Sequence, residues 1–214
     1  LLSGAGIKTP LSCAGAGLAR SVKQQRILAL SRCRDSIFAC VEHDMEKGLI
    51  ERLMALDDIT EPDELTTHIE RIVQGLGFDY FRLAIIIPVS HQRPEIRILN
   101  SCPEEWIESY SKQGMIARDP VVAAARRQLT PIRWDKVRGT DEQVDVMIEA
   151  AKCGLRCGVS YPLHGPRGEH GVLSFITERY QPALYVEIAS TLAMVVPNVL
   201  EAAIRICRPK GDAG

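Results

Sequence analysis

The stretch CGVSYPLHGPRGEHGVLSFIT, residues 157–177, contains two apolar runs separated by a glycine-rich turn. The runs, residues 157–163 and 170–177, have the length of strands and carry β-branched and aromatic side chains. The turn from His164 to Gly168 holds two glycines and a proline, which favour a tight reversal of the chain. Antiparallel strands can be joined by such a short connection, so this stretch predicts a β-hairpin.

A second hairpin is predicted upstream of the first. Residues 78–89 are apolar and rich in β-branched side chains, and residues 95–99 repeat the pattern after a turn at His91 to Pro94. Two tight hairpins imply an antiparallel sheet. Because strand residues of both parities are apolar, we expect both faces of that sheet to be covered.

Helical periodicity surrounds the two hairpins. From Asp44 to Asp58 apolar residues recur at helical spacing, and a second helix is expected to be capped by Thr60 and stopped by Gly75 and Gly77. Further predicted helices cover residues 103–115, 119–127, 141–153 and 182–206, the last kinked at Pro197. This order predicts an α+β fold, an α-β-α sandwich whose central antiparallel sheet of about five strands has helices on both faces.

Composition restricts the class of protein. Hydrophobic residues make up 46% of the chain and charged residues 25%, and the net charge is −1, so no global field favours nucleic acid or an anionic membrane. The seven cysteines show neither zinc-ligand nor CxxC spacing, which indicates a reduced, cytoplasmic protein. No apolar run approaches the roughly 18 residues of a membrane span, so none is expected.

The N-terminal segment differs in composition from the rest. Its first 34 residues hold six Lys or Arg and no Asp or Glu, together with stretches of small residues. We therefore expect residues 1–43 to be a disordered or appended segment. The folded domain is expected over residues 44–207, with residues 208–214 as a tail.

Several short motifs occur in a fixed order across the expected domain. They are CPxxWxxxY from Cys102, DPVV from Asp119, PIxW from Pro131, AxxxGL from Ala150, GVSxPLHG from Gly158 and GxLSF from Gly171. Intervals of 13 residues from Trp106 to Asp119 and of 15 from Asp119 to Trp134 accompany them. Together they resemble the autoinducer-binding domain of LuxR-type quorum-sensing regulators, over residues 45–200.

The resemblance implies a pocket for an N-acyl-homoserine lactone between the sheet and one helical layer. By position, Trp106 resembles the donor to the lactone carbonyl, Asp119 the acceptor from the amide N–H, and Ser174 the partner of the amide carbonyl. An apolar slot with a few fixed polar groups suits such an amphiphile. The expected walls are Tyr110, Val121, Trp134, Met147, Ala150 and Leu155, and strand parity adds Ala84, Ile86, Ile96 and Ile98 around the acyl tail.

Two residues depart from the family pattern. Cys102 stands where the family usually has a tyrosine whose hydroxyl helps bind the amide carbonyl, so one expected hydrogen bond is missing. Arg82 shares its strand parity with Ala84 and Ile86 and is expected to project towards the pocket. A buried guanidinium without a partner is costly, so Arg82 either reaches the rim or binds something polar. The ligand is therefore an ordinary acyl lactone, an unusually acylated signal or a signal that is not a lactone.

Other interpretations of the same residues are open or weak. Asp119 before Pro120 is also a typical helix N-cap, and Trp106 and Trp134 are also typical core aromatics. Ser160, His164 and Asp119 do not make a hydrolase site, because GVSYP is not the GxSxG elbow. The five histidines lack metal-ligand spacing, and no phosphate-binding loop precedes a helix. The chain is therefore expected to be no enzyme and to need no cofactor.

Two functional hypotheses follow. In the first, the chain is the input domain of a quorum-sensing transcriptional regulator that binds an acyl-homoserine lactone and forms homodimers through its long C-terminal helix. In the second, it is a truncated, ligand-independent decoy that pairs with related full-length regulators and inhibits them. The family continues into a helix-turn-helix domain where this sequence stops, so specific DNA binding by this chain alone is not expected. Membrane association is not expected either, because no apolar run is long enough to span a bilayer.

Overall fold

The computed structural model describes residues 47–88 and 94–208. Five strands form one antiparallel sheet in the order β2-β1-β5-β4-β3, as expected for an α+β sandwich. The strands are β1 (Tyr80–Pro88), β2 (Pro94–Asn100), β3 (Ile132–Arg133), β4 (Cys157–His164) and β5 (His170–Thr177). Both predicted hairpins are confirmed, and the central contact joins β1 to β5. The short β3 was not located from the sequence, because two residues carry no periodic signal.

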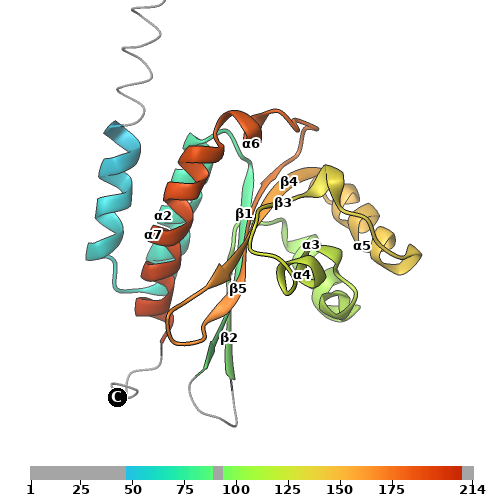
Figure 1. Cartoon of the computed structure of the whole chain (residues 1–214), viewed down its shortest axis with the longest axis horizontal. Helices are drawn as coiled ribbons and strands as arrows, with labels where there is room; N and C mark the ends of the chain where they lie inside the picture. Colours follow the sequence, from blue (N-terminus) through green and yellow to red (C-terminus); the bar gives the residue numbers. More distant parts are fainter. Residues whose placement is uncertain (1–46, 89–93, 209–214) are drawn as a thin grey trace, which may run out of the picture. The chain divides into compact units, whose positions relative to one another are not determined.

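Helices cover both faces of the sheet (Figure 1). On one face, α2 (Pro62–Gly75) and α7 (Ala189–Cys207) pack together, with a helix over residues 47–54 outside them and α6 (Leu184–Glu187) ahead of α7. On the other face lie α3 (Glu104–Lys112), α4 (Pro120–Ala125) and α5 (Asp141–Lys152). The single-turn helices η1 (Ala55–Asp58), η2 (Met115–Ala117) and η3 (Trp134–Lys136) lie in the connections. The three layers confirm the expected α-β-α sandwich.

The two faces of the sheet are buried to different degrees. Along β1, Phe81, Leu83, Ile85 and Ile87 are fully buried and belong to the core shared with α2 and α7. The alternate side chains, from Tyr80 to Ile86, are only partly buried. Because successive strand residues point to opposite faces, the α3–α5 layer leaves space above the sheet that the α2–α7 layer does not.

Some helix boundaries differ from the sequence expectation. The predicted helix over residues 182–206 is divided at Ile188, whose backbone leaves the helical region, into α6 and α7. Pro197 lies inside α7 as expected. Thr60 does not cap α2: Glu61 holds the N-cap position, with no side-chain hydrogen bond, because Pro62 already occupies the first helical turn. Residues 1–43, most of the turn at residues 91–94 and the tail after Arg208 lie outside the described residues.

Helix α7 is the one described helix long and apolar enough to cross a membrane by length and composition, which the sequence analysis did not anticipate. Its buried side includes Leu192, Val195 and Val199, which lie in the core with α2 and the sheet. About 33% of the apolar stretch is buried inside the domain, so internal packing accounts for part of its hydropathy.

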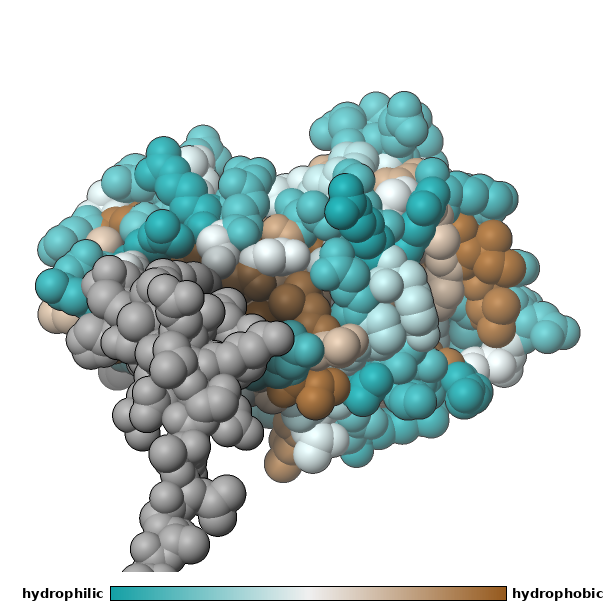
Figure 2. Space-filling view, turned by 90° about the horizontal axis from the view of Figure 1, so that it is seen from above, coloured by the Kyte–Doolittle hydropathy of each residue, from teal (hydrophilic) through white to brown (hydrophobic). Residues whose placement is uncertain are grey.

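The surface seen from above is mainly hydrophilic, with apolar side chains gathered in separate patches (Figure 2). On α5, Val144 and Ile148 lie one turn apart and are both exposed. They leave an apolar strip on the outer side of α5.

Candidate functional site

A cavity of about 360 Å³ lies between the sheet and the α3–α5 layer. Its floor comes from β1, β2 and β5, and its walls from α3, α4, α5 and the segment around Trp134. The cavity is open along β2, where Ile96 is 55% exposed and Ile98 44% exposed. Its volume is in the range of small-molecule sites, and most of its lining is apolar.

Strand register explains which side chains form the floor. Ala84 of β1 faces Ile98 on β2 and Val172 on β5. Two residues earlier along β1, Arg82 stands directly beside Ser174. Alternate residues share one face of a sheet, so the apolar area around Ala84 and the polar area around Arg82 lie on the same surface. The polar area lies next to α3 and α4.

Asp119 is placed at the N-cap of α4, as Asp before Pro120 predicts. Its Oδ1 accepts hydrogen bonds from the backbone N–H of Val121 at 2.7 Å and of Val122 at 3.3 Å. Its Oδ2 accepts from the hydroxyl of Tyr110 at 2.8 Å. Burial raises the pKa of Asp119, although these three hydrogen bonds and the charge of Arg82 oppose the shift. One carboxylate oxygen thus caps the helix and the other lines the cavity.

Tyr110 and Trp106 lie together on α3, one helical turn apart, with ring centroids separated by 5.2 Å. Both rings are buried and both line the cavity. Burial raises the pKa of the Tyr110 hydroxyl, and the adjacent Asp119 raises it further. Tyr110 therefore remains a neutral hydrogen-bond donor to Asp119.

Trp134, Ser160 and Ser174 form a chain of hydrogen bonds. The indole Nε1–H of Trp134 donates to Ser160 Oγ at 2.8 Å, and Ser160 Oγ lies 2.7 Å from Ser174 Oγ. The indole has only a donor, so Ser160 Oγ accepts from it, whereas either serine can donate in the hydrogen bond between Ser160 and Ser174. Ser174 lines the cavity. Ser160 itself is fully buried behind this lining.

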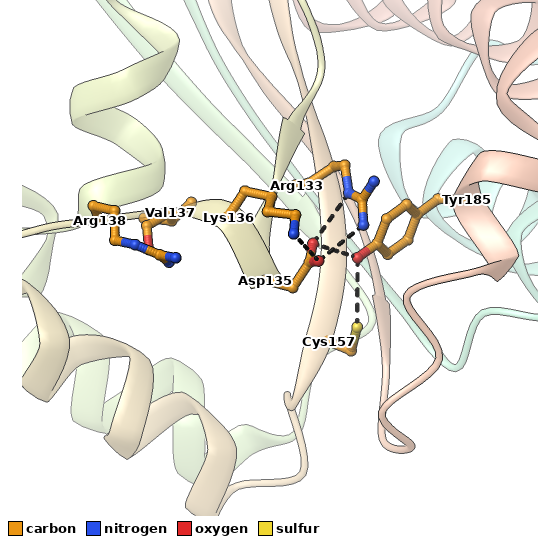
Figure 3. A network of polar contacts seen from close by, with 7 residues as sticks. All are labelled: Arg133, Asp135, Lys136, Val137, Arg138, Cys157 and Tyr185. Atoms are coloured by element: carbon orange, nitrogen blue, oxygen red, sulfur yellow. Dashed lines mark hydrogen bonds and ion pairs between the residues drawn. The ribbon is translucent and has the colours of Figure 1, made fainter.

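Asp135, the residue after Trp134, connects the cavity wall at Trp134 with α6 (Figure 3). Asp135 Oδ1 accepts from the hydroxyl of Tyr185 at 2.7 Å, and Arg133 donates to both oxygens of Asp135. Tyr185 belongs to α6, and its hydroxyl lies 3.9 Å from the Sγ of Cys157. Burial alone would raise the pKa of Asp135, but the hydrogen bonds from Arg133 and Tyr185 outweigh it and lower that pKa. Asp135 is therefore a charged anchor beneath the cavity wall.

The cavity brings together most of the residues singled out in the sequence. Thirteen of the fourteen line it: Ala84, Ile86, Ile96, Ile98, Trp106, Tyr110, Asp119, Val121, Trp134, Met147, Ala150, Leu155 and Ser174. Arg82 also lines it, as its strand parity predicted.

Cys102 is not part of the lining. Its thiol instead donates to the backbone carbonyl of Phe81 at 3.5 Å, and burial raises its pKa to about 11. A thiol is shorter than a phenol and here turns towards the main chain, so the side chain ends in the packing around Trp106 and Tyr110.

The sequence analysis missed several further lining residues. Val172 and Ile176 stand two residues either side of Ser174 on β5 and could have been found by strand parity. Ile116, Val122, Ala125, Arg126, Val146, His164, His170 and Gly171 also line the cavity. Most residues of this second group lie in short or irregular segments or at element ends, where no periodicity indicates which way a side chain points.

Comparison with known proteins relates the site to one family. The model of the family described as "Autoinducer binding domain" matches residues 61–199, the segment that holds the whole cavity lining. The transcriptional activator AhyR of Aeromonas hydrophila is 43% identical over 169 residues, which cover 75% of this chain and 64% of AhyR. The chain thus spans a little under two thirds of that relative.

Two solved structures share the fold. The LuxR-family factor CepR2 from Burkholderia cenocepacia superposes with a TM-score of 0.66 at 20% identity, covering 77% of this chain and 99% of CepR2. SdiA of Escherichia coli, in a structure with octanoyl-rac-glycerol, superposes with a TM-score of 0.62 at 25% identity, covering 77% of this chain and 68% of SdiA.

Proposed function

The chain belongs to the autoinducer-binding domain family of LuxR-type transcriptional regulators, and from that premise we propose that it binds an N-acyl-homoserine lactone in the cavity above the sheet. One observation carries the proposal. A mostly apolar cavity holds, at one end, a carboxylate oxygen, an indole and a serine hydroxyl, contributed by Asp119, Trp106 and Ser174. One amide and one lactone on an apolar chain need such a set of partners.

Each polar group is assigned one task. Asp119 Oδ2, which already accepts from Tyr110, has a second lone pair for the amide N–H of the ligand. Trp106 Nε1–H donates to the lactone carbonyl. Ser174 donates to the amide carbonyl, because Trp134 and Ser160 orient its hydroxyl. Fixing the donors and acceptors beforehand lowers the entropic cost of binding.

The acyl chain is assigned to the apolar floor. Ala84, Ile86, Ile96 and Ile98 form a continuous apolar area away from the polar end. Burial of each CH₂ group there contributes up to about 0.8 kcal/mol. The related SdiA has been solved with octanoyl-rac-glycerol, an acyl ester, which supports an acyl-binding role for this cavity.

Thermal unfolding with a panel of acyl lactones, from short to long chains, tests the proposal. A lactone at 100 times its Kd should stabilise the folded chain by about 2.7 kcal/mol and raise the melting temperature accordingly. Homoserine lactone without an acyl chain serves as the control and should give no comparable shift. If no lactone shifts the unfolding of a folded preparation, the lactone-binding proposal is wrong.

In this role the chain acts as the sensing part of a cytoplasmic transcriptional regulator rather than as an enzyme. It dimerises with itself or with related regulators. A ligand-independent decoy is the competing function, and the same panel separates the two, since a decoy needs no lactone. Co-expression with a full-length relative should lower that relative's reporter output in either case, because a mixed dimer reads only one DNA half-site.

A further inference from the structure

Arg82 stands at the polar end of the cavity without a partner for one of its donors. It lies on the cavity face of β1, directly beside Ser174 of β5 and Asn100 of β2. Its Nη1 is buried and has no hydrogen-bond partner. Buried donors in folded proteins are nearly always paired, so an unpaired one that faces a cavity indicates a missing acceptor.

The groups around Arg82 do not supply that acceptor. The charge of Arg82 acts on Asp119, but Asp119 accepts from two backbone N–H groups and from Tyr110 and makes no hydrogen bond with Arg82 among the described residues. The guanidinium carbon lies 4.8 Å from the centroid of the Tyr110 ring. This cation–π contact favours the positive charge and holds the guanidinium at the polar end, but it provides no oxygen for Nη1.

The charges at this end of the cavity favour a neutral ligand. The positive charge of Arg82 lowers the pKa of Asp119 against the larger effect of burial, so the two groups lie close enough for their opposite charges to interact. An anionic group bound to Arg82 would lie against the carboxylate of Asp119. A neutral carbonyl oxygen accepts a hydrogen bond from Arg82 without that repulsion.

We propose that Arg82 Nη1 donates to a carbonyl oxygen of the ligand's acyl chain next to the head group, either the amide carbonyl or a 3-oxo group. This deepens the proposed lactone-binding function and rests on it. Ser174 and Arg82, adjacent across two strands, then form a pair of donors on the same side of the ligand. Arg82 in this role is a specificity-determining residue, because only an acyl chain with a carbonyl oxygen beside Arg82 can accept a hydrogen bond from the buried Nη1.

Titration calorimetry of the wild type, Arg82→Met and Arg127→Met tests the proposal with two lactones of equal chain length, one 3-oxo and one unsubstituted. Arg127 is exposed, just after the end of α4, and does not line the cavity, so it is a control with the same change in charge. Arg82→Met should weaken binding at least about tenfold, as expected for a charged hydrogen bond, and Arg127→Met less than about twofold. A larger loss for the 3-oxo lactone identifies the 3-oxo oxygen, and an equal loss identifies the amide carbonyl. Unchanged affinity for both lactones overturns the proposal.

Isotope-edited infrared spectroscopy separates donation from a purely structural role. With ¹³C at the carbonyl identified by calorimetry, the stretching frequency should be lower when the lactone is bound to wild type than to Arg82→Met. Equal frequencies overturn the proposal. If Arg82→Met does not fold, Arg82→Lys keeps the charge but has no Nη1, and it should still bind more weakly than wild type; equal binding overturns the proposal. If the wild type binds no lactone at all, the result contradicts the proposed lactone-binding function, on which the role of Arg82 rests.

Discussion

Asp119 performs two tasks through its two oxygens. Oδ1 caps α4 through Val121 and Val122, and Oδ2 faces the cavity and accepts from Tyr110. The N-cap reading and the ligand-binding reading of this residue are therefore geometrically compatible. Burial raises its pKa above the ordinary value of 3.8, so the folded state favours the protonated form more than the unfolded state does. The stability contributed by Asp119 is therefore lost as pH rises from 3.8 through the raised pKa.

Asp119→Asn should separate the two tasks. The oxygen of Asn can still cap α4, whereas its NH₂ group cannot accept from Tyr110 or from a ligand amide. In urea unfolding of the ligand-free proteins, we expect the stability of Asp119→Asn relative to wild type to increase as pH rises above 3.8, because only wild type loses stability there. Lactone binding should weaken by about 1.5–3 kcal/mol in calorimetry. Unchanged lactone affinity would remove Asp119 from the proposed site.

Ser160 is the middle of the chain from Trp134 to Ser174. In Ser160→Ala the indole N–H loses its acceptor and the hydroxyl of Ser174 loses its hydrogen-bond partner, so we expect a loss of about 1–3 kcal/mol of unfolding free energy. Lactone binding should also weaken, because the hydroxyl of Ser174 is no longer oriented. Ser111→Ala, at an exposed position of α3, is the control and should change neither quantity. If Ser160→Ala were as stable as wild type, the hydrogen bonds from Trp134 through Ser160 to Ser174 would not stabilise the fold.

At the scale of elements, the segment from β3 to η3 connects the cavity wall with the opposite helical layer. Trp134 lines the cavity, while the next residue, Asp135, accepts from Tyr185 of α6. Gly158 makes room for this wall, since a Cβ there would lie 2.7 Å from the Phe175 carbonyl oxygen and 3.1 Å from the Trp134 ring. The segment is thus held in place by contacts from both β4 and α6.

Tyr185→Phe tests how strongly α6 is held by Asp135. The variant keeps the ring but removes the hydroxyl, and we expect a loss of about 1.5–3 kcal/mol of unfolding free energy near neutral pH. The lowered pKa of Asp135 means that its stabilisation is present above 3.8 and is lost as pH falls through the folded-state value. The difference between wild type and Tyr185→Phe should therefore shrink in acid. Tyr180→Phe, at an exposed position, is the control.

At the scale of the whole molecule, most of the described helices pack against the sheet. Helices α2 and α7 pack on one face, and α3, α4 and α5 enclose the cavity on the other (Figure 1). The net charge of the chain is −1. Specific DNA recognition needs a helix or strand delivered to base edges together with Lys and Arg residues for the phosphates. Neither feature stands out in the part of the chain that the structure describes.

We therefore expect no sequence-specific operator binding by these 214 residues, with or without a lactone. The basic residues within positions 1–34 can attract DNA only without sequence preference and with strong dependence on salt. Electrophoretic mobility shifts with operator and scrambled DNA measure this directly. A shift that persists at about 200 mM salt and is competed only by the operator sequence would contradict the prediction.

Much of the cavity could be predicted because strand parity and motif spacing are local properties. The parity of Ala84, Ile86, Ile96 and Ile98 follows from two short apolar runs, and all four line the cavity. The direction taken by Cys102 could not be predicted, because a short side chain between two elements turns to whichever partner folding brings near it. Here that partner is the Phe81 carbonyl, 21 residues away in the chain.

The sequence by itself determined the two hairpins, most helices and the sandwich, because alternation, helical periodicity and turn residues act over a few neighbouring positions. The family followed from the order and intervals of short motifs that resemble it. Only the tertiary structure decided the strand order, which joins β1 to β5 and thereby places Arg82 beside Ser174. It also decided that the cavity is open along β2 and that Arg82 Nη1 lies buried without an acceptor. These features depend on contacts between segments about 90 residues apart, which no local pattern encodes.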